Sequence, residues 1–98
     1  MSVSATALVS IPEDVLFREL DGEAIILHLT RGMYFGLDAV GTRVWMVLAE
    51  SSSVGRAIDV LTAEYDVDSA VATGDVLELV SSLSDQGLVV VNPPSSPS

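Results

Sequence analysis

Apolar and polar residues alternate through the first part of the chain, between Val15 and Leu37, and this pattern predicts β-strands. Two turn signals divide the stretch. Asp21-Gly22 is typical of a two-residue hairpin turn, and Gly32 suits the left-handed position of a three-residue hairpin loop. The predicted strands are three antiparallel segments, at residues 15–20, 23–29 and 33–37.

The register of these hairpins decides which side chains share a face, because a slip of one residue moves every side chain to the other face. We expect Leu16 opposite Leu27, and Leu27 opposite Phe35. The larger and more apolar set is predicted to face the core: Leu16, Arg18, Leu20, Ile25, Leu27, Leu29, Met33, Phe35 and Leu37. The other face carries Val15, Phe17, Glu19, Ala24, Ile26, His28, Tyr34 and Gly36. It is itself partly apolar, so we expect something to cover it or the edge of the sheet.

From Asp38 onward, apolar residues recur at helical spacing and predict three helices. Asp38 suits an N-cap, the serines before Val54 supply another, and Gly87 suits the position after a helix end. The expected helices span residues 39–49, 54–65 and 70–86, and an apolar closing segment follows at 88–91. This order predicts an α+β, winged helix-turn-helix-like fold, with a three-stranded antiparallel sheet followed by three helices.

The length of 98 residues and the apolar content of 49% suit one domain with one core. We expect a flexible N-terminal arm at residues 1–11, a folded domain at 12–91 and a disordered tail at 92–98. Nothing resembles a signal peptide, and no apolar run approaches the roughly 18 residues of a membrane span. A cytoplasmic protein is therefore expected.

The charge balance narrows the class of partner. The chain has 14 acidic residues against four arginines and no lysine, for a formal charge of −10. Nucleic acids and anionic membranes attract basic surfaces, so neither is an expected partner. A winged-helix DNA-binding transcriptional regulator remains the alternative function, because the expected topology permits it.

No group of residues suggests catalysis, a metal site or a cofactor. The absence of cysteine excludes disulfides and thiolate ligands. His28 is the only histidine, and the serines have no visible base or oxyanion hole. Asp66 and Asp68 could bind Ca²⁺ only with the rest of an EF-hand loop, which is missing. We therefore expect a non-enzymatic binding protein without cofactor or metal.

Two elements could bind a partner. The strand at 33–37 comes last in the sheet, so its outer edge is open to strand addition by a peptide unless the segment 88–91 fills it. The sequence favours these two possibilities equally. The third helix has an apolar stripe wide enough that its flank either lines a groove or belongs to the core. That flank consists of Thr73, Leu77, Ser81 and Ser84.

Three segments in this order resemble the PqqD-like family. They are DGEAIILHLTRGMYFGLDAVGTRVWMVLAE, AIDVLTAEYDVD and DVLELVSSLSDQGL, and the resemblance covers about residues 15–90. It implies a RiPP recognition element, a domain that binds the leader of a ribosomally synthesised and post-translationally modified peptide. In such domains the leader adds as a strand beside the third strand, and its apolar side chains lie against the third helix.

The resemblance also implies site residues and partners. The peptide-binding residues would be Met33, Tyr34, Phe35, Gly36, Leu37, Thr73, Leu77, Val80, Ser81 and Ser84. The chain lacks the second-strand tryptophan and the cysteine near the first helix that mark the members serving quinone cofactor synthesis. It is more similar to the stand-alone members of lasso peptide biosynthesis. These bind a precursor leader peptide and hand it to a separate leader peptidase, cyclase or other modifying enzyme.

Overall fold

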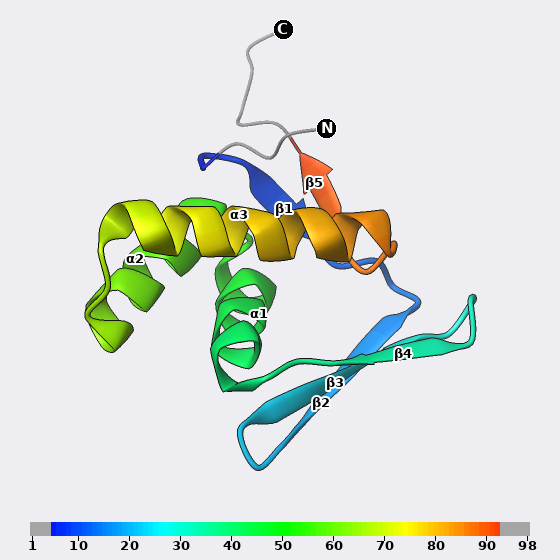
Figure 1. Cartoon of the computed structure of the whole chain (residues 1–98). Helices are drawn as coiled ribbons and strands as arrows, with labels where there is room; N and C mark the ends of the chain where they lie inside the picture. Colours follow the sequence, from blue (N-terminus) through cyan, green and yellow to red (C-terminus); the bar gives the residue numbers. More distant parts are fainter. Residues whose placement is uncertain (1–4, 93–98) are drawn as a thin grey trace, which may run out of the picture.

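A computed structural model describes residues 5–92 of the chain, and Figure 1 shows its helices packed on one side of a twisted sheet. The α+β architecture predicted from the sequence is confirmed. The elements are, in order, β1 (Leu8–Ser10), β2 (Val15–Leu20), β3 (Glu23–His28), β4 (Met33–Gly36), α1 (Ala39–Ser51), α2 (Val54–Tyr65), α3 (Ser69–Asp85) and β5 (Val90–Asn92).

The main sheet is antiparallel, with the strand order β2-β3-β4. Its first hairpin has the predicted register, with Leu16 opposite Leu27. The second hairpin is different, because its loop has four residues, from Leu29 to Gly32, and Leu27 lies opposite Tyr34 rather than Phe35. This slip of one residue puts Phe35 on the side where we expected Tyr34.

The prediction of the core face was wrong. The side of the sheet that packs on the helices carries Val15, Ala24, Ile26 and His28, all of them buried. Most of the larger apolar set instead lies on the exposed side of the sheet, which we call the open face: Leu16, Arg18, Leu20, Ile25 and Leu27. Tyr34, which we expected on the other face, shares this side because it lies opposite Leu27. Of the expected core residues, only Phe35 and Leu37 pack partly against the core.

Local capping begins the first two helices close to their predicted positions. The Asp38 carboxylate accepts a hydrogen bond from the Gly41 N–H, and the Ser53 hydroxyl accepts one from the Arg56 N–H. Trp45 of α1 is completely buried at the centre of the core, and Phe17 of β2 meets it edge-on with ring centroids 5.4 Å apart. The first helix thereby covers the inner face of the sheet.

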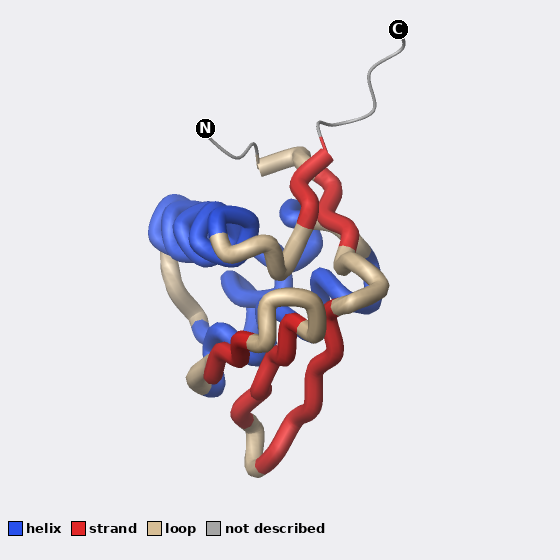
Figure 2. The backbone as a smooth tube through the Cα atoms, turned by 90° about the vertical axis from the view of Figure 1, so that its right-hand side faces the viewer, coloured by secondary structure: helices blue, strands red, loops and turns tan. Residues whose placement is uncertain are grey.

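The two ends of the described chain form a second, two-stranded sheet in which β1 pairs with β5. Figure 2 shows this small sheet at the end of the molecule opposite the β2–β3 turn. The expected flexible arm at residues 1–11 is therefore wrong for residues 8–10, because Val9 is buried and its N–H donates to the Ser52 carbonyl. Residues 1–4 and 93–98, which include most of the expected tail, lie outside the described residues.

Within residues 5–92, no helix has both the length and the apolar character needed to span a membrane.

Candidate functional site

Strand β4 has a neighbour on one side only. It pairs with β3, and in the described part of the chain no strand pairs with its other edge. The closing segment, which could have filled this edge, pairs with β1 as β5. The structure thus decides between the two possibilities left by the sequence: the edge is not occupied by the closing segment of the domain.

The ladder between β3 and β4 determines which backbone groups face outward. The Leu37 N–H donates to the Ala24 carbonyl at 2.8 Å, so these two residues form a hydrogen-bonded pair of the antiparallel ladder. Such pairs recur at every second residue, which turns the N–H and C=O of Phe35 toward β3. The outward groups are therefore those of Tyr34 and Gly36, with one N–H and one C=O each.

Thr42 of α1 anchors the end of this ladder. Its hydroxyl oxygen accepts the buried Ala24 N–H at 2.7 Å and donates to the Leu37 carbonyl at 3.3 Å. Thr42 therefore takes the place of a strand residue at the point where the chain turns from β4 into α1. The sequence pattern gave no reason to single out this threonine, because its role depends on where helix and sheet meet.

The side chains of β4 alternate between two environments. Met33 and Phe35 lie opposite the buried His28 and Ile26 and face the helix side of the sheet. Tyr34 and Gly36 face the open side, where Tyr34 is 75% exposed. A strand added to β4 would continue this alternation, because residues directly opposite each other share a face.

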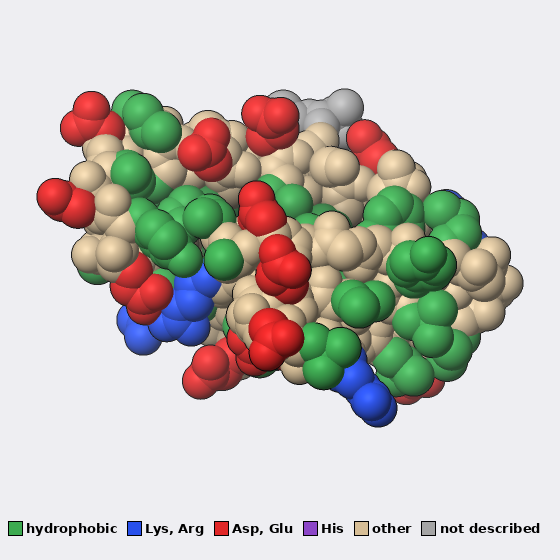
Figure 3. Space-filling model, turned by 60° about the horizontal axis from the view of Figure 1, so that its bottom comes forward, with side chains coloured by type: hydrophobic (Ala, Val, Ile, Leu, Met, Phe, Trp, Pro, Cys, Tyr) green, Lys and Arg blue, Asp and Glu red, His purple; other side chains and the backbone are tan. Residues whose placement is uncertain are grey.

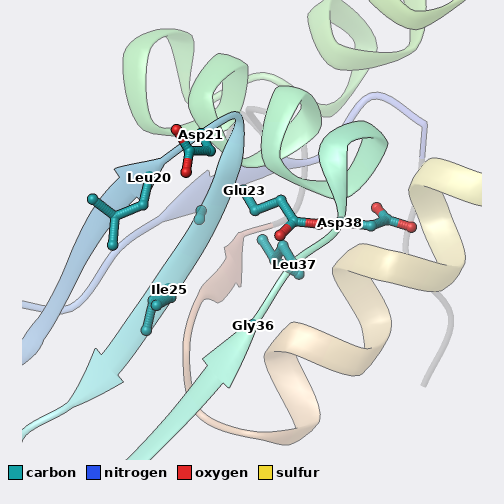
Figure 4. A pocket seen from close by; sticks show the side chains of 8 residues that line it. Leu20, Asp21, Glu23, Ile25, Gly36, Leu37 and Asp38 are labelled. Carbon is teal, nitrogen blue, oxygen red and sulfur yellow. The ribbon is translucent and has the colours of Figure 1, made fainter.

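Helix α3 runs above β4 in Figure 1, and its C-terminal part approaches β4 in Figure 4. Of its predicted contact residues, Val80 is 0% exposed and belongs to the core rather than to a surface. The remaining ones are half-buried and accessible: Thr73, Leu77, Ser81 and Ser84. Of the predicted site residues on β4 and α3, only Val80 is fully buried. The others are at least partly exposed on these two elements.

A side chain missed in the sequence connects these two elements. Arg31, in the loop before β4, donates from Nη1 to the carbonyl of Gln86 at the end of α3, at 3.3 Å. Its backbone N–H donates to Nδ1 of the buried His28, also at 3.3 Å. No sequence motif indicated this contact, which spans more than half the chain and exists only in the folded domain.

A family comparison fits this arrangement. A sequence model of the family described as coenzyme PQQ synthesis protein D (PqqD) matches residues 23–89. The chain belongs to the PqqD family. No curated protein sequence matches the chain.

Two solved structures resemble this PqqD-family domain. TbiB1 in complex with the TbiA(beta) leader peptide has a TM-score of 0.79 and 36% identity, over 82% of this chain and 93% of TbiB1. A lasso peptide synthetase B1 complexed with the leader peptide has a TM-score of 0.76 and 23% identity, over 84% of this chain and 96% of that one. The second likeness concerns the fold alone.

The open face of the PqqD-family domain is apolar and shallowly hollowed. A hollow of about 470 Å³ lies at the end of β4, and Figure 4 shows its walls. Its lining residues are Leu20, Asp21, Glu23, Ala24, Ile25, Gly36, Leu37 and Asp38. A Cβ on Gly36 would meet no atom within 4 Å, so this glycine leaves open space on the sheet. In Figure 3, apolar side chains gather over the right-hand end of the molecule, whereas acidic side chains lie mostly over the remainder, among further apolar ones.

The titratable groups near β4 serve the fold. Nδ1 of His28 lies 3.8 Å from the Asp14 carboxylate, and the Thr30 hydroxyl donates to that carboxylate. The Thr30 hydrogen bond lowers the pKa of Asp14 below its ordinary value of 3.8. Over residues 5–92, no cluster of three or more potential metal ligands occurs.

Proposed function

We propose that this PqqD-family domain binds the leader region of a ribosomally synthesised precursor peptide by strand addition to β4. It then delivers the precursor to a separate maturation enzyme, a leader peptidase or cyclase. The outward-facing backbone groups of Tyr34 and Gly36 carry this proposal, because they are what an extended peptide needs for pairing. TbiB1, which shares 36% identity with this chain, binds a leader peptide.

The peptide would be held by two kinds of contact. Its backbone would pair with Tyr34 and Gly36, while alternate side chains would lie opposite Met33 and Phe35 and point toward α3. There they would meet Thr73, Leu77, Ser81 and Ser84, next to Leu37 at the end of the strand. Each buried apolar side chain supplies roughly 1.5–3 kcal/mol, and sub-micromolar binding needs about 8–10 kcal/mol. A few such anchors with the backbone hydrogen bonds are therefore sufficient.

The domain would perform no chemistry of its own. Holding the leader raises the local concentration of the precursor at the enzyme, which is the role of a cytoplasmic peptide chaperone that needs no cofactor. The open face remains accessible while a peptide lies on the β4 edge. Its exposed Leu16, Ile25 and Leu27 form an apolar surface continuous with that edge, and this surface suits a partner enzyme.

The test is a proline substitution at an outward-facing position. A peptide selected from a displayed library of random linear peptides is titrated against the wild type, Tyr34→Pro and Tyr34→Ala. Tyr34→Pro removes an N–H that points away from β3, so the domain stays folded and loses the peptide. Tyr34→Ala keeps the N–H and retains most of the binding.

Phe35→Pro is the matched control, because it removes an N–H that points into the sheet. It lowers the free energy of unfolding itself, as measured by chemical denaturation. The proposal fails if folded Tyr34→Pro binds the selected peptide as tightly as the wild type does.

A further inference from the structure

Arg31 stands apart from the other arginines of this acidic chain. Arg43 forms a two-point ion pair with Glu64, at 2.8 and 2.6 Å, between α1 and α2. Arg18 lies on the open face in β2, and Arg56 lies on α2. Arg31 alone lies in the loop that leads into β4, beside the end of α3.

The guanidinium of Arg31 has a defined position. It donates to the Gln86 carbonyl, and a Cβ on Gly87 would lie only 3.3 to 3.6 Å from its Cζ, Nη2 and Nε atoms. The planar group therefore lies against the backbone of Gly87, which has a φ of +76° and no side chain in the way. Arg31 thus crosses from the β4 loop to the C-terminal end of α3, where the helix dipole favours a cation.

Among the described residues, none supplies an anionic partner for this guanidinium. Across the described range of 5–92, the ion pairs join His28 with Asp14 and Arg43 with Glu64, and none includes Arg31. A guanidinium has five N–H donors, and the Gln86 carbonyl, which is neutral, takes one of them. A carboxylate supplied by a ligand would form shorter and stronger charge-assisted hydrogen bonds there.

We propose that Arg31 is a specificity-determining residue that pairs with an acidic side chain of the bound leader. This inference rests on the proposed function, because a carboxylate reaches Arg31 only if the peptide adds to β4. Elsewhere the net charge of −10 repels acidic peptides. Arg31 therefore favours an acidic residue at one position of the leader, whereas acidic residues at its other positions weaken binding.

The ladder gives the spacing of the leader residues. In an antiparallel added strand, the residues opposite Phe35 and Met33 point toward α3, and the next residue on that side would extend past the start of β4 toward the loop that carries Arg31. The leader pattern, from N to C, is then apolar, any, apolar, any, acidic. An acidic residue after the apolar ones indicates an antiparallel leader strand, and an acidic residue before them indicates a parallel one.

The experiment selects peptides from one displayed library of random linear peptides in parallel against the wild type, Arg31→Gln, Arg31→Glu, Arg18→Gln and the strand-addition variant Tyr34→Pro. The wild type and Arg18→Gln enrich an acidic residue two positions after an apolar one. Arg31→Gln keeps the apolar positions and loses the acidic one, while Arg31→Glu enriches Lys or Arg there. A purely structural role of Arg31 would not reverse the charge preference.

A selected peptide and its Glu-to-Gln counterpart give the size of the effect. The wild type binds the Glu form about tenfold tighter, as expected for hydrogen bonds to a charged group, and Arg31→Gln binds both forms alike. An apolar pattern without the acidic position, or an acidic preference unchanged in Arg31→Gln, overturns the inference. If the wild type enriches no peptides that Tyr34→Pro does not also enrich, the proposed function itself is overturned.

Discussion

The two faces of the β2-β3-β4 sheet have similar apolar content, yet only one of them is buried. On β3, Ile26 is 0% exposed, while its neighbour Ile25 is 43% exposed. Helix α1 contacts β3 on the inner side, where Trp45 fills the core. No helix or strand in the described part of the chain covers the open face. Apolar residues of this sheet therefore stabilise the fold on one side, while on the other side they stay exposed and form the surface proposed for a partner enzyme.

The largest expected effect separates these two faces directly. Ile26→Ala should lower the free energy of unfolding by about 2–5 kcal/mol, because it opens a cavity in the core. Ile25→Ala, one residue away, should lower it by about 1 kcal/mol or less, because that side chain is already half in water. Urea denaturation of both variants measures the contrast. Equal losses would mean that the open face is covered in solution.

A second comparison concerns how substitutions on α3 and on the open face of the sheet change peptide binding. Leu77→Asp on α3 should weaken binding of a selected peptide by roughly 10- to 100-fold, which corresponds to the loss of one apolar anchor. Leu77 is half-buried, so the domain should remain folded. Ile25→Asp on the open face is the control and should leave peptide affinity nearly unchanged in a fluorescence polarisation titration. Unfolding of Leu77→Asp would instead assign Leu77 to the core.

The junction between sheet and helix gives a smaller effect. Thr42→Val keeps the shape of the side chain but leaves the buried Ala24 N–H without an acceptor. This should cost about 1–3 kcal/mol of folding free energy. Thr42→Ser retains the hydroxyl and should lose much less in the same denaturation experiment. If Val and Ser are equivalent, the hydroxyl does not anchor the end of β4.

The smallest expected effect is the pH dependence that Asp14 contributes near the buried His28. Because the hydrogen bond from Thr30 lowers the pKa of Asp14, the ionised carboxylate stabilises the folded state. This stability is present above pH 3.8 and is lost as the pH falls below it toward the folded-state pKa. Denaturation midpoints of wild type and Asp14→Asn should therefore converge in acid. Thr30→Val should reduce the difference, and a gap that stays constant with pH would contradict the assignment.

Much of the local structure could be predicted from the sequence. Asp21-Gly22 indicated the first turn, where both residues have positive φ, and Asp38 and Ser53 marked the starts of α1 and α2. These signals were sufficient because turns and caps depend on neighbouring residues. Strand β4 was also predicted as a candidate binding element, because it comes last in the three-stranded sheet. The faces of β4 were predicted wrongly, because Gly32 indicated a three-residue loop and the loop before β4 has four residues.

The amino-acid sequence was enough to predict the order of every element after β1, the acidic character and the family of this domain, because those depend on short-range patterns and composition. Three features depend on the folded domain: which face of the sheet is buried, which backbone groups of β4 point outward, and that the Arg31 side chain reaches the end of α3. The tertiary structure also decided that the closing strand pairs with β1 rather than with β4. Each of these outcomes depends on contacts between residues far apart in the chain. An apolar residue or a strand edge has the same sequence signal whether or not another part of the fold covers it.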